Sequence, residues 1–188
     1  MLVVAGNIAT GKTQLLAALG RGLALQTFPE RWESNPWFEA DRGHQFLAQM
    51  WFLLAAGADH AHMPDRGGVQ ERCIHEHALV FGRALLSGED ARLLGECYSR
   101  LDAALPDPDL LIYLEAPVPA LLERIRDRGR AQEQALTAEQ LESLQSGYEE
   151  LLAGWSRCPI LEVDTTSVDL RSDEGTRHVL ELVSEALR

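Results

Sequence analysis

Cysteine and long apolar runs are both scarce in this sequence. The 188 residues include three cysteines, and no two of them form a C-x-x-C pair. An odd number of scattered cysteines argues against a disulfide framework or a zinc knuckle and favours a reducing compartment. The longest apolar stretch, residues 46–58, is interrupted by Gln49 and is too short to cross a bilayer. Because the opening MLVVAG also lacks the basic start of an export signal, we expect a cytoplasmic protein with no membrane partner.

Basic residues are few as well. The chain carries 17 lysine and arginine residues against 29 aspartate and glutamate residues, which gives a formal net charge of −12. A surface this acidic repels the phosphates of DNA and RNA, so we expect no nucleic-acid polymer as a partner. Of the 17 basic residues only one is a lysine, Lys12. The length and the 46% hydrophobic content are sufficient for one globular core.

Short apolar runs alternate with longer stretches of helical periodicity. This alternation is typical of an α/β fold with a parallel sheet, and the absence of a linker or repeat predicts a single domain over residues 1–188. Residues 44–57 are apolar on nearly every side, which predicts a helix that is buried all round. Strands are predicted at residues 2–5, 23–28, 69–70, 110–114 and 160–163, and the other helices at 14–19, 74–86, 117–129, 137–155 and 179–187.

Residues 6–13 read GNIATGKT, which matches the phosphate-loop pattern G-x-x-x-x-G-K-[ST]. The pattern follows a predicted strand and precedes a predicted helix, as this loop requires. Its backbone N–H groups would face the phosphates, Lys12 would reach the outer ones, and Thr13 would offer its hydroxyl to Mg²⁺. The residues predicted to bind a nucleoside triphosphate are Gly6, Asn7, Ile8, Ala9, Thr10, Gly11, Lys12 and Thr13.

The single lysine narrows the class of nucleotide-binding protein. A signalling GTPase needs a lysine in N-K-x-D to read guanine, and a protein kinase needs a separate lysine on a strand. Because Lys12 already belongs to the phosphate loop, the sequence excludes both classes.

Four arginines gather in a short segment of this acidic chain. Arg124, Arg126, Arg128 and Arg130 share seven residues with a single acid, Asp127. Taken alone, the segment could be a solvated helix face. Beside a phosphate loop, the better interpretation is a set of arginine forks that clamp phosphates, on a lid that would hinge near residue 129.

Two polar residues stand out without a motif around them. Gln49 lies in the apolar helix, and a buried amide must find hydrogen-bond partners or reduce stability by roughly 1–3 kcal/mol. A glutamine can read the edge of a base, but from the residues alone a core glutamine bonded to backbone is the better interpretation. Glu30, at the end of the second predicted strand, could equally be a surface acid.

Five segments together resemble the deoxynucleoside kinases: GNIATGKT, FPERWESNP from residue 28, QMWFL from residue 49, ERCIHEHALVF from residue 71 and ERIRDRGRAQEQ from residue 123. The resemblance covers nearly the whole chain, with the motifs in the order of the family. It implies a phosphate-loop kinase fold with a five-stranded parallel sheet flanked by helices and a short arginine-rich lid at about residues 124–136. It also implies a homodimer. The implied reaction is the phosphorylation of the 5′-hydroxyl of a deoxynucleoside with ATP and Mg²⁺, which is a step of nucleotide salvage.

The resemblance further implies roles for individual residues. Glu30 matches the general base that takes the proton of the 5′-hydroxyl. Arg72 matches the arginine that holds the 5′-oxygen, and Glu71 matches the acid that assists magnesium through water. The predicted catalytic residues are Lys12, Glu30, Arg72, Arg124 and Arg128, and the predicted magnesium residues are Thr13 and Glu71.

Other matched positions would contact the nucleoside and the phosphate donor. Gln49 matches the glutamine that reads the base, Phe81 the aromatic residue that stacks on it, and Glu133 the lid acid that touches the 3′-hydroxyl. Arg128 and Arg130 match lid arginines that bind the donor, and Asp169 and Leu170 would border its adenine. The predicted substrate-binding residues are Glu30, Phe38, Gln49, Arg72, His77, Phe81 and Glu133.

Three positions depart from the family pattern. Phe38 stands where a tyrosine commonly helps to hold the 3′-hydroxyl, so sugar selection would be looser or would use Glu133 alone. Ala56 and His77 stand where an arginine and an aspartate commonly read the base. We favour deoxyadenosine or deoxyguanosine as the substrate, with a pyrimidine-accepting site as the alternative.

Two other functions remain open at this point. A nucleoside monophosphate kinase of the thymidylate kinase type would need an additional cation beside Glu30, for which Arg31 or Arg42 would serve. A nucleotide-binding module without turnover would keep the phosphate loop alone. The presence of Glu30, Arg72 and the lid arginines argues against the module.

Overall fold

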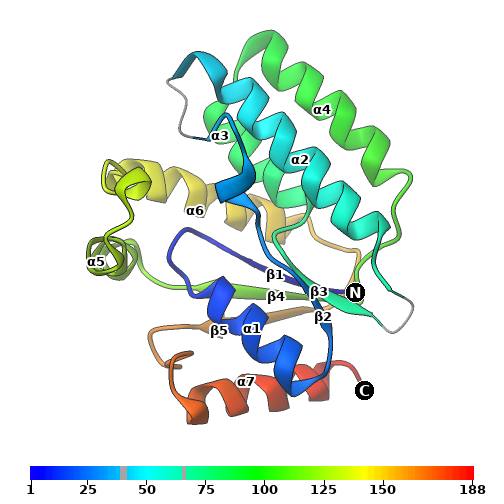
Figure 1. The fold of residues 1–188 in the computed structure, drawn as a ribbon, viewed down its shortest axis with the longest axis vertical. Coiled ribbons are helices and arrows are strands. Elements are labelled where there is room, and N and C mark those ends of the chain that lie inside the picture. The colour runs from blue at the N-terminus through cyan, green and yellow to red at the C-terminus, as the bar shows by residue number, and fades with distance from the viewer. Residues whose placement is uncertain (39–41, 65–66) are drawn as a thin grey trace.

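Five parallel strands form the centre of the protein (Figure 1). The computed structural model describes residues 1–38, 42–64 and 67–188. The order across the sheet is β2-β3-β1-β4-β5, and every neighbouring pair is parallel, which confirms the predicted fold class. The strands are β1 (Leu2–Gly6), β2 (Gln26–Phe28), β3 (Gly68–Glu71), β4 (Leu110–Glu115) and β5 (Ile160–Asp164).

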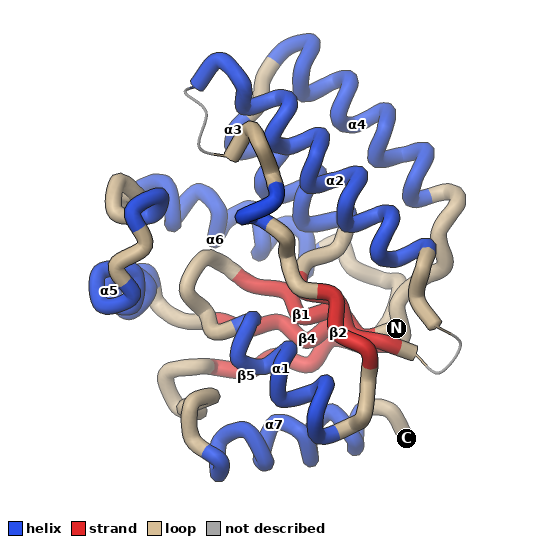
Figure 2. Tube along the Cα trace, viewed as in Figure 1, coloured by secondary structure: helices blue, strands red, loops and turns tan. Residues whose placement is uncertain are grey.

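Helices connect the strands and cover both faces of the sheet (Figure 2). The α-helices are α1 (Lys12–Gly22), α2 (Gln45–Ala61), α3 (Arg83–Leu85), α4 (Gly88–Asp102), α5 (Val118–Arg128), α6 (Ala138–Ala153) and α7 (Asp173–Ala186). Short 3₁₀ turns are η1 (Trp32–Ser34), η2 (Arg42–His44) and η4 (Ala131–Glu133), and η3 (Glu76–Gly82) is a π-helix.

The apolar core has two layers because successive side chains of a strand point to opposite faces. On one face, Leu2 and Val4 of β1 pack with residues of α1 and α7. On the other face, Val3 and Ala5 pack with residues of η3 and α6. These four β1 side chains are at most 4% exposed. The central strand is therefore fixed from both sides, which gives a rigid base to the loop that follows it.

The strand order brings separate parts of the sequence to one edge of the sheet. The carboxyl end of β1 lies between those of β3 and β4, with Val4 in register with Glu71 and Gly6 in register with Leu114. Ligands of open α/β sheets bind outside the carboxyl ends of the strands. The phosphate loop, Glu71 and the segment after β2 therefore lie along the same edge.

Two details of the helices differ from the sequence-based expectations. The helix predicted over 44–57 is not buried all round, because α2 packs on α4 and η3 and leaves Leu47 and Leu54 exposed by 39% and 51%. The helix α4 was not expected, although Leu94, Cys97 and Leu101 follow a helical spacing along it. That apolar stripe covers part of α2, and it explains why only one side of α2 remains open.

In the described part of the chain, every helix is too short or too polar to span a bilayer.

Candidate active site

The phosphate loop is a tight turn between β1 and α1. Gly6 and Gly11 have φ angles of 143° and 98°, which L side chains rarely adopt. A Cβ at Gly6 would lie 2.4 Å from the carbonyl oxygen of Leu114, so only glycine fits there. The side-chain amide of Asn7 donates to the carbonyl of Leu141 at 2.9 Å and ties the loop to α6. The glycine backbone and the bond of Asn7 to α6 therefore fix the shape of the loop.

Lys12 lies inside this loop and is 5% exposed. Its Nζ donates to the carbonyl oxygen of Asn7 at 2.7 Å. Burial, and then the positive charge of Arg72, lower the pKa of Lys12 to about 7, while Glu71 opposes this shift. The protein alone therefore does not fully stabilise the charged form of Lys12. Phosphate oxygens beside it would supply the missing negative charge.

Thr13 and Glu71 join α1 to the end of β3. The Thr13 hydroxyl lies 3.1 and 3.2 Å from the two carboxylate oxygens of Glu71. Burial raises the pKa of Glu71, and the charge of Lys12 works in the opposite direction. A hydroxyl and a carboxylate are hard oxygen donors of the kind that Mg²⁺ takes together with phosphate oxygens and water. These two residues fit a magnesium ion.

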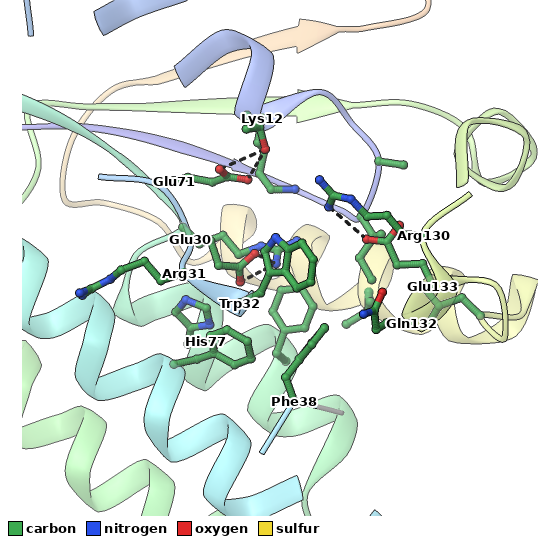
Figure 3. A pocket seen from close by; sticks show the side chains of 18 of the residues that line it. Lys12, Glu30, Arg31, Trp32, Phe38, Glu71, His77, Arg130, Gln132 and Glu133 are labelled. Carbon is green, nitrogen blue, oxygen red and sulfur yellow. Dashed lines mark hydrogen bonds and ion pairs between the residues drawn. The ribbon is translucent and has the colours of Figure 1, made fainter. Parts of the chain in front are cut away.

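Glu30, labelled in Figure 3, forms an ion pair with Arg72, and both residues line the cavity. Arg72 Nη1 donates to both carboxylate oxygens of Glu30 at 2.8 Å, and the two side chains are 8% and 13% exposed. Burial alone would raise the pKa of Glu30, but the charges of Arg72, His77 and Lys12, with the hydrogen bonds from Arg72, together lower it. Glu30 is therefore a carboxylate at neutral pH, held in one place and ready to accept a proton.

The backbone of Arg72 adopts a left-handed conformation, with a φ angle of 58°. For a residue other than glycine this conformation costs about 1–2 kcal/mol and is found most often at functional sites. The Arg72 N–H still donates to the carbonyl of Val4 at 3.1 Å, which extends the pairing between β1 and β3 by one residue. The turn points the guanidinium across the cavity toward Glu30.

Glu76 is a residue of the site that the sequence reasoning missed. It is 0% exposed and accepts hydrogen bonds from the backbone of Cys73 at 3.1 Å and of Gly6 at 3.4 Å. Its Oε1 also lies 2.8 Å from the hydroxyl of Tyr148 and 4.0 Å from Nε of Arg72. Glu76 thus connects the phosphate loop to the turn that carries Arg72. A lone acid within the apolar run CIHEHALVF was the signal that could have found it.

The part of the cavity next to α2 and η3 is lined by aromatic rings, one amide group and one imidazole group. Gln49 and Phe52 come from α2, and His77 and Phe81 come from η3. The Phe52 ring stacks on His77, and the Arg72 guanidinium lies 4.3 Å from the centre of the Phe81 ring. The Oε1 atom of Gln49 is buried and finds no hydrogen-bond partner among the described residues. The interpretation of Gln49 as a satisfied core amide is therefore wrong for this atom.

The arginine segment has two distinct parts. In α5, Arg124 donates to the hydroxyl of Thr165 at 2.8 Å and to its carbonyl at 2.6 Å, so it holds the end of β5 and does not line the cavity. Gly129, with a φ angle of 66°, ends the helix. Beyond it, Arg130 lies 5.0 Å above the Trp32 ring. Arg128 and Arg130 both pair with Glu133.

One cavity of about 730 Å³ collects most of the predicted site. In the view of Figure 3, Lys12 and Glu71 lie on one side of Glu30, and His77 and Phe38 lie on the other. The predicted residues that line the cavity are Ile8, Ala9, Gly11, Lys12, Thr13, Glu30, Phe38, Gln49, Glu71, Arg72, His77, Phe81, Arg128, Arg130 and Glu133. Those that do not are Gly6, Asn7, Thr10, Ala56, Arg124, Asp169 and Leu170.

Arg31, one of the two cations considered for a phosphate acceptor, turns away from Glu30. Its guanidinium donates to Asp59 at 2.7 Å, and its side chain is 46% exposed. The side chain of Arg42, the other candidate, lies outside the described residues.

A parallel sheet in this order, with a phosphate loop after its central strand and a carboxylate–arginine pair facing that loop, defines a phosphate-loop kinase. The profile of the family "Deoxynucleoside kinase" matches residues 2–187, and the chain belongs to this family.

Individual relatives agree with this assignment. The deoxyadenosine/deoxycytidine kinase of Bacillus subtilis is 29% identical over 189 residues, covering 94% of this chain and 87% of that protein. The deoxyadenosine kinase of Dictyostelium discoideum is 30% identical, covering 87% of this chain and 71% of that protein. A solved structure of deoxyadenosine kinase from M. mycoides superposes with a TM-score of 0.81 at 20% identity, covering 98% of each chain.

These comparisons confirm the predicted family, fold and enzyme class. They also confirm, at the level of the family, the assignment to nucleoside phosphorylation and salvage. The family match favours a nucleoside over a nucleoside monophosphate as the phosphate acceptor.

Proposed function

We propose that this protein transfers the γ-phosphoryl group of ATP to the 5′-hydroxyl of a deoxynucleoside. The observation that carries the proposal is the Glu30–Arg72 ion pair, which faces Lys12, Thr13 and Glu71 within one cavity. One end of the cavity thus holds groups that suit a triphosphate. The other end holds flat aromatic rings and neutral hydrogen-bonding groups that suit a base.

On the donor side, the backbone of the phosphate loop and Lys12 would hold the β- and γ-phosphates of ATP. Thr13 would bind Mg²⁺ directly and Glu71 through water, and the ion would neutralise charge on the transferring group. Arg128 and Arg130 line the same cavity, and their guanidinium forks would bind phosphate oxygens once they leave Glu133.

On the acceptor side, Glu30 would take the proton of the 5′-hydroxyl, and Arg72 would hold the oxygen in line with the γ-phosphate. Because the transition state of phosphoryl transfer is loose, a weakly basic carboxylate is sufficient if it is well placed. Gln49 and Phe81 would hold the base. Glu133 and Phe38, which also line the cavity, would contact the sugar.

A substrate screen tests this proposal. ATP consumption is measured with the four deoxynucleosides, with their ribonucleoside counterparts and with the deoxynucleoside monophosphates. We expect turnover with deoxynucleosides and 5′-monophosphates as products, since Arg31, one of the two cations considered for an acceptor phosphate, is paired with Asp59. Turnover only with monophosphates would assign a monophosphate kinase instead. ATP binding without turnover on any acceptor would mean that the protein is a nucleotide-binding module without kinase activity.

We also propose that the protein is a cytoplasmic homodimer that pairs through α2. The three cysteines are free, as a reducing compartment favours. Leu47 and Leu54 lie two turns apart on the uncovered side of α2, and a second copy would bury them.

Light scattering on the purified protein tests the dimer. We expect a mass of two chains for the wild type and of one chain for Leu54→Asp, because a charge at the centre of an apolar interface is costly to bury. Leu187→Asp is the matched control: Leu187 is 46% exposed near the C-terminus and lies outside α2, so the dimer should persist. A monomeric wild type would rule the dimer out.

A further inference from the structure

Tyr148 and Glu76 meet behind the phosphate loop. Both residues are 0% exposed, and neither lines the cavity. The hydroxyl of Tyr148, on α6, lies 2.7 Å from the carbonyl oxygen of Gly6 and 2.8 Å from Oε1 of Glu76. Burial raises the pKa of Tyr148 well above its usual value, so the hydroxyl keeps its proton. One phenol is therefore within hydrogen-bond distance of two other oxygen atoms.

These two contacts need two protons. The hydroxyl of a tyrosine supplies one, and its oxygen can accept another. The carbonyl oxygen of Gly6 carries no proton, so only Glu76 can supply the second. An ionised carboxylate would leave one of the two oxygen pairs without a hydrogen between them, whereas a carboxylic acid completes both bonds. The short contacts on both sides of the Tyr148 hydroxyl thus favour a protonated Glu76.

The guanidinium of Arg72 gives an independent indication. Its Nε atom is buried, has no hydrogen-bond partner among the described residues, and lies 4.0 Å from Oε1 of Glu76. A guanidinium beside an ionised carboxylate closes to about 2.7–2.9 Å. Arg72 instead donates from Nη1 to both oxygens of Glu30 at 2.8 Å. The wider distance on the Glu76 side fits a neutral acid, since Arg72 already has a counter-ion in Glu30.

The charges around Glu76 agree with this interpretation. Burial raises the pKa of Glu76, and it outweighs Arg72, the Tyr148 hydroxyl, a backbone N–H and Lys12, which act in the opposite direction. These groups come from the turn after β3, from α6 and from α1. Arg72 is paired with Glu30, and burial lowers the pKa of Lys12 itself to about 7. Little positive charge is therefore left to hold Glu76 in its ionised form.

We propose that Glu76 is a positioning residue that works as a neutral acid: it donates its proton to Tyr148, which donates its own proton to the carbonyl oxygen of Gly6. This inference rests on the proposed function and deepens it by adding two residues behind the phosphate loop. The chain of hydrogen bonds fixes the peptide plane that follows Gly6, where the loop begins. Because Glu76 carries no charge, the guanidinium of Arg72 keeps its full charge for Glu30 and the 5′-oxygen.

Infrared spectroscopy of the wild-type protein at neutral pH tests the protonation of Glu76 without any need for turnover. A protonated carboxyl group absorbs as a carbonyl, at a frequency separate from that of carboxylates. We expect such a band in the wild type and its loss in Glu76→Gln. The matched control is Glu162→Gln, which changes an exposed glutamate and should leave the band in place. An acid band that is the same in the wild type and in Glu76→Gln would overturn the inference.

Tyr148→Phe makes the test independent of how well the glutamine variant folds. The substitution removes one oxygen atom from a buried ring, and with it the acceptor of the Glu76 proton. A carboxylic acid whose hydrogen bond is weakened absorbs at a higher frequency, so we expect the band to move upward. An acid band that stays at its wild-type frequency would overturn the inference.

Steady-state kinetics tests the effect on the phosphate loop. Glu76→Met has a side chain of similar length that forms no strong hydrogen bond, and we expect it to lower kcat/KM for ATP by about tenfold. The amide in Glu76→Gln can donate to Tyr148 and accept from the N–H of Cys73, so it should recover most of this loss. Equal values in the two variants would overturn the inference, because neither a role in packing nor a need for negative charge distinguishes an amide from a thioether.

The substrate screen separates this inference from the proposed function. A wild type with normal turnover and an ionised Glu76 would overturn the inference alone. A wild type that phosphorylates no deoxynucleoside would overturn the proposed function and the positioning role with it, while the infrared spectra would still decide whether Glu76 is neutral.

Discussion

Replacing Lys12 with alanine is expected to abolish phosphoryl transfer. Lys12 is the only lysine of the chain, and its ammonium is the charge that the phosphate loop holds toward the outer phosphates. Loss of such a preorganised charge lowers turnover by at least about 10²–10³-fold, and here no second ammonium side chain is available to replace it. Turnover is measured by ATP consumption with saturating deoxynucleoside. A variant with wild-type rates would overturn the assignment of the phosphate loop.

The control for this substitution is Arg21→Ala. Arg21 is an exposed basic residue in the last turn of the same helix and lies outside the cavity. Its removal changes the net charge by the same amount, so wild-type turnover in this variant would show that the effect of Lys12→Ala is local.

The pH dependence of ATP binding gives an additional check on Lys12. Because its pKa is lowered to about 7 by burial and by Arg72, the ammonium loses its proton as the pH rises above that value. Phosphate oxygens bind the protonated form, so affinity for ATP should fall with rising pH, by up to about tenfold per pH unit. Calorimetry should detect proton uptake on binding. Lys12→Ala should lose this dependence.

Glu30→Gln is expected to lower turnover by roughly 10²–10⁴-fold while ATP binding persists. The amide keeps the shape of the side chain but cannot take the proton of the 5′-hydroxyl. It also loses the negative charge that pairs with Arg72 at 2.8 Å. Turnover and ATP affinity are measured on the same preparation. Wild-type turnover would remove Glu30 from the role of base.

A control variant, a pH profile and a stability measurement check this prediction. Glu162→Gln changes an exposed glutamate on β5 and should leave turnover unchanged. In the wild type, Arg72 together with the other charges around Glu30 outweighs the effect of burial and lowers the pKa of Glu30. Glu30 therefore stays ionised to a lower pH than an ordinary glutamate, so the acid limb of kcat/KM should lie at a lower pH than an unperturbed glutamate would give if the protein remains folded. Thermal unfolding of each variant shows whether the loss of charge beside Arg72 has reduced stability.

The sequence was sufficient for those parts of the fold and site that are local. The phosphate loop is eight consecutive residues, and its glycines, its lysine and the alternation of strands and helices can be read directly. The strand at 110–114 and the helix predicted over 137–155 were equally clear, because each depends on its own residues.

What the sequence could not supply depends on residues that are distant along the chain. Glu30 and Arg72 are 42 residues apart, and they meet only because β2 and β3 are neighbours in the sheet. Arg124 was grouped with Arg128 because the two are close in sequence, but the structure shows that its guanidinium joins Thr165 to the carbonyl of Ala9 in the phosphate loop. The exposed side of α2 depends on where α4 packs, which no property of α2 itself determines.

The single lysine has a consequence for the covalent chemistry of the whole chain. Lys12 is the one lysine of the sequence and supplies its one side-chain amine. With a pKa of about 7 that amine is largely nucleophilic at slightly alkaline pH, where ordinary lysines are not. Acylation of a lysine side chain in this protein can therefore occur only inside the phosphate loop. A triphosphate bound there would both cover this amine and protonate it, so the extent of acylation would report how much of the loop is occupied.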